Sequence, residues 1–259
     1  MTEQKVAFVT GSGAPRVGNA IARRLAAMGF RIALHANSSL EHAEQTAAEL
    51  RGQGVETKIV SGSLEEAERA ETLVDEVTAA MGRIDVLVNS AAIWYPTRLE
   101  EVTAAEVRRY LEINALSTFM AARAAGLRMV EQPEGGVIVN IGDWAVARPY
   151  LDHAAYFPSK GAVEAITRSL AVELAERNRS VRVNCVRPGP VLLAEDMPEE
   201  KRQAVEQSTL LKRVGTPEHI AHAVQFLVEN DFVTGVSLPV DGGRTIYAND
   251  ALQTTHRTG

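Results

Sequence analysis

Tyr156 and Lys160 have the types and the spacing of a proton-transfer pair. They stand four residues apart in YFPSK, near the start of a predicted helix, so their side chains share one helix face. An ammonium beside a phenol stabilises the phenolate, and we therefore expect Lys160 to lower the pKa of Tyr156 from about 10 toward the working range of a proton donor. By itself such a pair is more often part of a solvated helix face. The motifs around it decide between the two interpretations.

A glycine-rich turn near the N-terminus has the features of a phosphate cradle. TGSGAPRVG at 10 to 18 follows the apolar run KVAFV and precedes a predicted helix, so backbone N–H groups and the positive end of the helix dipole can face an anion. The glycines that suit this role are Gly11, Gly13 and Gly18, although such glycines also serve simple chain reversal. Pro15 stiffens the turn. Arg16 either adds charge for a phosphate or is an ordinary solvated arginine.

The end of the second predicted strand bears on the choice of nucleotide. It reads LHANSS and lacks the carboxylate that commonly binds an unphosphorylated ribose. Asn37, Ser38 and Ser39, with Arg16 across the turn, leave room for a 2′-phosphate, which favours NADP(H). Ser39 as a helix cap is the alternative.

Composition limits the class of protein. A chain of 259 residues with 46% hydrophobic residues can form one domain spanning 1–259. The net charge of −6 argues against nucleic acid and anionic membranes as partners. Cys185 lies in an apolar stretch and is interpreted as a buried small hydrophobe. No signal segment begins the sequence and no metal site is predicted, so we expect a cytoplasmic protein.

Short apolar runs alternate with longer amphipathic stretches along the whole chain. This alternation predicts a doubly wound, seven-stranded parallel sheet with helices on both faces. The runs predicted as strands are 5–10, 31–36, 55–60, 84–89, 136–141, 181–186 and 235–240, and the stretches predicted as helices are 17–29, 40–53, 64–81, 103–131, 154–178 and 217–229.

Local signals mark helix starts and loops. Ser63 with Glu66 and Thr103 with Glu106 have the spacing of capping boxes, and Thr216 before Pro217 suits an N-cap and a first helical residue. The irregular stretches follow strands at the edge where ligands bind in such sheets. They are 91–102, 143–153 and the predicted substrate loop 187–216.

Several motifs together resemble those of the short-chain dehydrogenase/reductase family along nearly the whole chain. They are the TG turn at 10, NSAA at 89–92, Asn114 in a long helix, the Tyr156 and Lys160 pair, RPG at 187–189 and VDGG at 240–243. The resemblance implies a Rossmann fold and a nicotinamide cofactor. It also implies a homotetramer paired through helices 103–131 and 154–178, whose apolar residues can alternatively just cover the sheet.

The resemblance also implies roles for individual residues. Tyr156 would be the general acid/base, Lys160 would bind the nicotinamide ribose, and Asn114 would position Lys160 through water. Asn89 would support the cofactor loop. Without the resemblance, Asn114 is interpreted as an ordinary helix residue. The remaining positions expected to contact cofactor are Val17, Ser63, Leu64, Ala91, Pro188 and Gly189.

Asp143 departs from the family pattern, which has a serine thirteen residues before the tyrosine. An ionised aspartate accepts hydrogen bonds and donates none, so it cannot polarise a carbonyl as a hydroxyl does. It can instead anchor an amino-bearing ring or relay a proton. Together with Arg16 in the turn and WYPT at 94–97, Asp143 gives the pattern of pteridine reductases within the family.

That subgroup implies a pterin stacked between nicotinamide and Trp94. Trp94 as a plain core or interface aromatic is the alternative. Ser38 stands where the subgroup tends to have a basic residue, which weakens the cofactor assignment. Leu192 and Met197 are expected to shape the substrate pocket, unless they serve only surface packing.

These observations predict an NADPH-dependent reductase of dihydropteridine-like substrates, with Tyr156 as the proton donor. One alternative keeps the fold and makes the substrate a ketone, sugar or acyl carbonyl. Another is a nicotinamide-binding sensor or scaffold without catalysis. The tail from 245 to 259 has little periodicity and is expected either to order against a neighbouring subunit or to be partly disordered.

Overall fold

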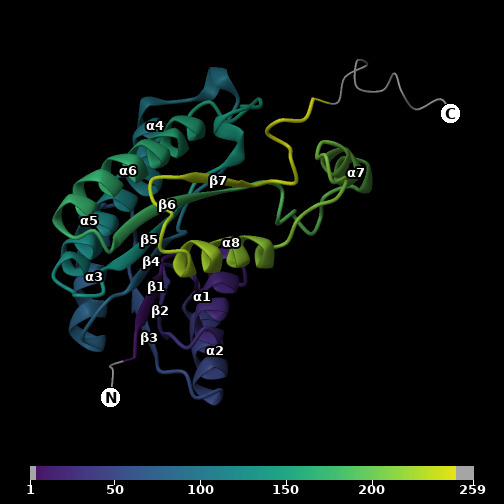
Figure 1. The fold of residues 1–259 in the computed structure, drawn as a ribbon. Coiled ribbons are helices and arrows are strands. Elements are labelled where there is room, and N and C mark those ends of the chain that lie inside the picture. The colour runs from purple at the N-terminus through teal and green to yellow at the C-terminus, as the bar shows by residue number, and fades with distance from the viewer. Residues whose placement is uncertain (1–3, 249–259) are drawn as a thin grey trace.

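The computed structural model describes residues 4–248, and its centre is a parallel β-sheet. The strand order is β3-β2-β1-β4-β5-β6-β7, with every neighbouring pair parallel (Figure 1). This confirms the predicted doubly wound, seven-stranded sheet. The strands are β1 (Val6–Val9), β2 (Arg31–Ala36), β3 (Thr57–Ser61), β4 (Val86–Asn89), β5 (Gly136–Ile141), β6 (Val181–Pro188) and β7 (Ser237–Val240).

Helices cover both faces of the sheet and bury its apolar side chains in two cores. One core contains residues of α3 (Glu68–Met81), α5 (Ser117–Val130) and α6 (Tyr156–Arg177). The other contains residues of α1 (Val17–Ala27), α2 (Leu40–Gly52) and α8 (Pro217–Glu229). Figure 1 shows these two sets on opposite sides of the sheet. Strands buried on both faces explain the continuous apolar runs in the sequence.

The direction of winding reverses between β1 and β4, which are neighbours in the sheet. From β1 the chain crosses over to β2 and then to β3. It then returns and places β4 on the side of β1 opposite β2. Loops at the carboxyl ends of β1 and β4 therefore separate and leave a crevice, which is where ligands bind in open sheets of this kind.

Two predicted helices differ from the observed ones. α3 begins at Glu68 rather than at 64, and the Ser63 hydroxyl accepts from the amide of Glu65 instead of capping a helix, so the capping box at 63 and 66 is wrong. The stretch 103–131 is divided into α4 (Ala104–Tyr110), the π-helical segment η2 (Leu111–Leu116) and α5.

At the other two predicted caps, the structure agrees in part or in full. Thr103 accepts from the Glu106 amide, but the Glu106 carboxylate receives a bond from Thr97 rather than closing a box. Thr216 and Pro217 begin α8 as expected, with His219 completing the box.

The predicted loop 187–216 contains a further helix, α7 (Glu199–Gln207). None of its residues is buried, so it lacks the apolar stripe by which helices are found in a sequence. Of the predicted tail, residues up to 248 are described and form a turn at 242–246, while 249–259 lie outside the described residues. None of the helices within residues 4–248 is long and apolar enough to cross a lipid bilayer.

Candidate active site

A cavity of about 900 Å³ opens at the carboxyl ends of the central strands. Its walls come from the turn after β1, the ends of β2, β4, β5 and β6, and the start of α6. Most residues predicted to bind cofactor or substrate line it. They are Gly11, Arg16, Val17, Gly18, Asn37, Ser38, Ser39, Ser63, Leu64, Ala91, Trp94, Asp143, Tyr156, Lys160, Pro188, Gly189, Leu192 and Met197.

Three predicted site residues lie behind the cavity wall rather than in it. Gly13 packs against the β2–α2 connection, where an added Cβ would lie 2.6 Å from the Ser39 hydroxyl oxygen. Asn89 is buried and donates to the side chain of Asn140 at 3.0 Å, which ties β4 to β5. Asn114 is the third. These residues shape the wall and do not reach a ligand in the cavity directly.

Asn114 fixes the loop that follows β4. Its Oδ1 accepts from the backbone amide of Ile93 at 2.9 Å, and its Nδ2 donates to the Ile93 carbonyl and to the Ser159 hydroxyl. The residue lies in η2, and π-helical turns are often found at functional sites. Asn114 therefore connects the β4 loop to the residue before Lys160, whereas its predicted water bridge to Lys160 stays a prediction.

The glycine turn has the shape that a dinucleotide needs. Gly11 has φ of +64°, and a Cβ there would lie 2.8 Å from the Ala91 Cα. At Gly18 an added Cβ would lie 2.6 Å from the Gly11 carbonyl oxygen. Side chains at either position would fill the cradle or displace its walls, and α1 begins at Val17 with its free amides at the cavity. The residues present therefore fit the pyrophosphate of a nicotinamide dinucleotide.

His35, near the end of β2, holds this turn in place. Its Nδ1 accepts from the Gly11 amide at 3.0 Å, so Nε2 carries the proton and donates to the Gly62 carbonyl at 3.0 Å. Burial lowers the pKa of His35 and keeps the ring neutral. The sequence stretch LHANSS contains His35 but does not reveal this role, because the role depends on contacts with Gly11 and Gly62, which lie 24 and 27 residues away.

Asp143, Tyr156 and Lys160 form the candidate reactive centre of the cavity. The Tyr156 hydroxyl donates to Oδ2 of Asp143 at 2.8 Å. Asp143 follows β5 and accepts the Ala145 amide with Oδ1 at 2.8 Å, which sets the carboxylate orientation. Lys160 is buried and donates to the Ile141 carbonyl at 2.8 Å. One acceptor, one proton donor and one ammonium thus meet where β5 ends and α6 begins.

The structure corrects the expected pKa of Tyr156. Burial raises that pKa well above 10, and the negative charge of Asp143 and the hydrogen bond to it raise it further. Lys160 was expected to lower it, but burial lowers the pKa of Lys160 itself. Tyr156 therefore keeps its proton throughout the neutral range in the ligand-free protein.

Aromatic side chains form the outer wall of the cavity. Trp94 is half exposed and stacks on His153 with 4.6 Å between ring centroids. Its indole N–H donates to the Tyr150 hydroxyl at 3.2 Å. Tyr150 in turn packs edge-on against Phe157, which follows Tyr156 in the chain. Trp94 thus lines the cavity and is not part of the buried core, whereas its stacking on a pterin stays a prediction.

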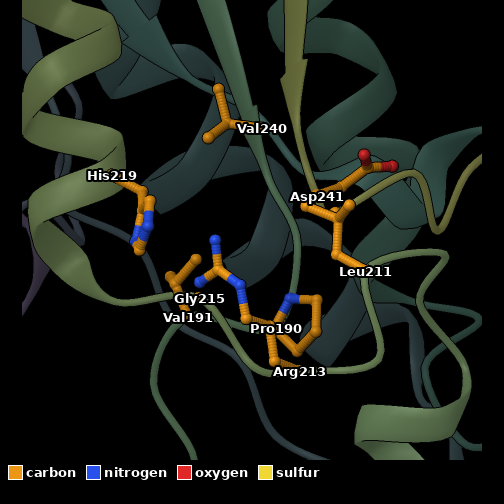
Figure 2. Close-up of a pocket in the computed structure, with 9 residues that line it drawn as sticks. Pro190, Val191, Leu211, Arg213, Gly215, His219, Val240 and Asp241 are labelled. Carbon is orange, nitrogen blue, oxygen red and sulfur yellow. The ribbon is translucent and has the colours of Figure 1, made fainter.

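A second cavity, of about 130 Å³, lies beside the first at the ends of β6 and β7. Pro190 and Val191 line it together with Arg213 and His219 (Figure 2). Figure 2 also shows the Asp241 carboxylate pointing away from the Arg213 guanidinium. None of the predicted catalytic residues lines this cavity.

Comparison with known proteins identifies the family. Residues 14–245 match a family model described as enoyl-(acyl carrier protein) reductase. The chain is 33% identical over 254 residues to a short-chain type dehydrogenase/reductase of Picea abies, covering 93% of this chain and 92% of that protein. The chain belongs to the short-chain dehydrogenase/reductase family. This membership confirms the coarser resemblance, and the closer similarity to pteridine reductases stays a prediction.

Two further members of the family show its range. A 7alpha-hydroxysteroid dehydrogenase of Clostridium sardiniense is 34% identical over 249 residues, covering 93% of each chain. The crystal structure of acetoin dehydrogenase from Enterobacter cloacae has a TM-score of 0.88 at 29% identity, covering 96% of this chain and 99% of that one. The fold of this chain is therefore shared with that dehydrogenase.

The role of His35 gives a prediction for pH-dependent stability. The unfolded chain binds a proton at His35 near pH 6.5, whereas the folded chain resists protonation until lower pH. The free energy of unfolding should therefore fall as the pH drops below about 6.5. His35→Asn should lose this component in urea titrations between pH 7.5 and 5.5. His42→Asn, at an exposed helical position, should keep it, and equal pH dependence in both variants would contradict the role of His35.

Proposed function

We propose that the chain is a nicotinamide-dependent reductase that converts a carbonyl group to an alcohol, with Tyr156 as the proton donor. Membership of the family supports oxidoreductase chemistry, and two of the relatives are named as a hydroxysteroid dehydrogenase and an acetoin dehydrogenase. The observation that carries the proposal is the protonated Tyr156 hydroxyl, held by a carboxylate in a cavity beside a dinucleotide cradle. A donor that keeps its proton suits the direction of reduction.

The chain's own residues supply binding, alignment and the proton. When bound, a nicotinamide provides the hydride that is transferred to the substrate. Gly11, Gly18 and the amides at the start of α1 would hold its phosphates, and Lys160 would bind its ribose. Tyr156 would turn its hydroxyl from Asp143 to the substrate oxygen and protonate it. The buried ammonium of Lys160 then stabilises the phenolate against the charge of Asp143.

We further propose that NADP(H) is preferred over NAD(H). Asn37, Ser38 and Ser39 line the cavity where a ribose 2′-phosphate would lie, and Arg16 lines it across the turn. These groups offer hydrogen-bond donors and one positive charge, while β2 ends without the carboxylate that would repel a phosphate. The charge and donor types at this edge support the preference.

A second candidate substrate is a dihydropterin or a similar nitrogen heterocycle. The specific observation in its favour is the Asp143 carboxylate, which can accept from a ring amino group as it now accepts from Tyr156. Trp94 on the cavity wall offers a flat surface for stacking. Both features suit a planar, amino-bearing ring better than a simple ketone.

A substrate screen distinguishes the two candidates. NADPH and NADH oxidation would be followed with a panel of ketones and acyl carbonyls and with dihydropterins, for the wild type and Asp143→Ser. If carbonyl compounds are the substrates, Asp143→Ser should keep or increase their turnover, because a hydroxyl can donate to a carbonyl oxygen. If dihydropterins are the substrates, the same variant should lose turnover of dihydropterins. Absence of nicotinamide oxidation with every compound would contradict the reductase function itself.

Tyr156→Phe tests the proton donor. The variant should bind NADPH as the wild type does, since it keeps the ring and loses one hydroxyl. Turnover should fall at least about a hundredfold, the usual scale for loss of a general acid. Stopped-flow NADPH oxidation and cofactor fluorescence titration measure the two quantities separately. Retained turnover would show that another group supplies the proton.

A further inference from the structure

A guanidinium that the family motifs do not explain lies on the wall of the active-site cavity. Arg244 follows the VDGG motif, and its Cζ lies 4.3 Å from the ring centroid of Trp144. Arg244, Trp144, Asp143 and Tyr156 all line the same cavity. Trp144 directly follows Asp143 in the chain. The Arg244 guanidinium and the candidate reactive centre therefore contact the same cavity.

The turn that carries Arg244 is built from short-range hydrogen bonds. Asp241 is buried, its Oδ1 accepts from the Gly243 amide at 2.9 Å, and its Oδ2 accepts from the amide and hydroxyl of Thr245 at 2.7 and 2.6 Å. Gly242 and Gly243 have φ of +63° and +79°, a conformation that favours glycine. The backbone at Arg244 is therefore held in one conformation.

Neighbouring segments hold this turn over the cavity from two sides. Arg148, after β5, donates to the carbonyl oxygens of Arg244, at 3.1 Å, and of Tyr247. Lys212, from the loop before α8, donates to the Tyr247 hydroxyl at 2.8 Å. Arg148 thus holds the backbone of this turn through its carbonyl oxygens and not through the Arg244 guanidinium.

The charge of Arg244 is only partly solvated. The side chain is half-buried, and burial lowers its pKa against the opposing influence of Tyr150, Asp143 and Asp241. Within the described part of the chain its guanidinium contacts the indole of Trp144 rather than a carboxylate. Both oxygens of Asp143 already accept hydrogen bonds from other groups. A half-buried guanidinium on an aromatic ring is suited to bind an anion that enters the cavity.

We propose that Arg244 binds a carboxylate of the substrate, so that the substrate is a carbonyl compound with an acid group. The planar guanidinium matches a carboxylate with two parallel hydrogen bonds. Its positive charge also offsets the repulsion that Asp143 exerts on an anionic substrate. A carboxylate monoanion suits a single guanidinium better than a phosphate dianion, which usually engages several donors. The carbonyl group of this substrate rests on the proposed reductase function. The anion site rests on the contacts of Arg244 and does not depend on that function.

Intrinsic fluorescence can test the anion site without turnover. The sequence has two tryptophans, so Trp94→Phe leaves Trp144, under Arg244, as the reporter. In this background, oxo acids of three to ten carbons and their methyl esters would be titrated, with inorganic phosphate as a separate arm. At least one acid should bind about tenfold or more tighter than its ester, the scale of a hydrogen bond to a charged group. Phosphate should bind more weakly than that acid.

Variants at Arg244 and Arg213 complete the experiment. Arg244→Gln should abolish the preference for acid over ester, and Arg244→Lys should keep part of it. Arg213→Gln removes the same charge from the wall of the neighbouring cavity and should keep the preference unchanged. Thermal melting of each variant separates loss of binding from loss of folding, and Arg244→Lys keeps the test informative if Arg244→Gln unfolds.

The results that would overturn the anion site differ from those that would overturn the reductase function. Equal binding of acid and ester by the Trp94→Phe protein with Arg244 in place, an unchanged preference when Arg244→Gln is added, or tighter binding of phosphate would overturn the proposal. Turnover of neutral ketones with no acid preference would leave the reductase function in place and remove the anion site. An Arg244-dependent acid preference without NADPH oxidation would leave the anion site in place and remove the reductase function.

Discussion

The hydrogen bond from the Tyr156 hydroxyl to the Asp143 carboxylate is the interaction on which the proposed chemistry of this cavity depends. It joins the segment after β5 to the start of α6, and Tyr156 is buried while Asp143 is half-buried. Burial of Tyr156 disfavours a phenolate, and the carboxylate of Asp143 beside it disfavours one further, so the pKa of Tyr156 is raised and the proton remains on it. A serine at position 143 would impose no such charge. The aspartate at position 143 is therefore the departure from the expected family pattern that bears on the proton of Tyr156.

The rest of the fold holds this pair in register with a cofactor cradle. β1 and β4 lie side by side at the switch point, and β5 continues the sheet next to β4, so three loops converge on one cavity. Buried polar side chains fix those loops. His35 bonds the glycine turn, and Asn114 holds the β4 loop by both backbone groups of Ile93. Fully satisfied buried groups of this kind make a site rigid.

The charged groups of the cavity come from distant parts of the chain. Asp143 brings a negative charge, Lys160 a buried ammonium beside it, and Arg244 a guanidinium above Trp144. Arg16 adds a further positive charge at the cofactor turn. In the proposed mechanism the positive groups serve different ends, because Lys160 stabilises the phenolate while Arg244 and Arg16 bind anionic parts of substrate and cofactor.

The sequence predicted the sheet well and placed Tyr156 and Lys160 on one helix face, because both depend on local pattern. Apolar runs buried on two faces mark strands, and Tyr156 and Lys160 lie within one helical turn. The helix α7 was missed because none of its side chains is buried, and Ser63 was misread because the chain turns once more before α3.

The properties that the sequence did not reveal depend on long-range contacts. The role of His35 depends on an amide 24 residues earlier in the chain. Arg244 acquires its significance from Trp144, which lies a hundred residues away. The direction of the Tyr156 pKa was predicted wrongly because burial cannot be read from a Tyr-x-x-x-Lys spacing, and because the Tyr156 hydroxyl donates to the carboxylate of Asp143.

The most direct measurement is the titration of Tyr156 itself by NMR, with tyrosine labelled with 13C at the ζ carbon. The sequence has five tyrosines, and the spectrum of Tyr156→Phe identifies the relevant signal. In the ligand-free wild type, Tyr156 should remain protonated beyond pH 10, and in Asp143→Asn its pKa should fall toward the ordinary value. A Tyr156 that titrates at or below pH 10 with Asp143 in place, or one that titrates identically in the two proteins, would contradict the account.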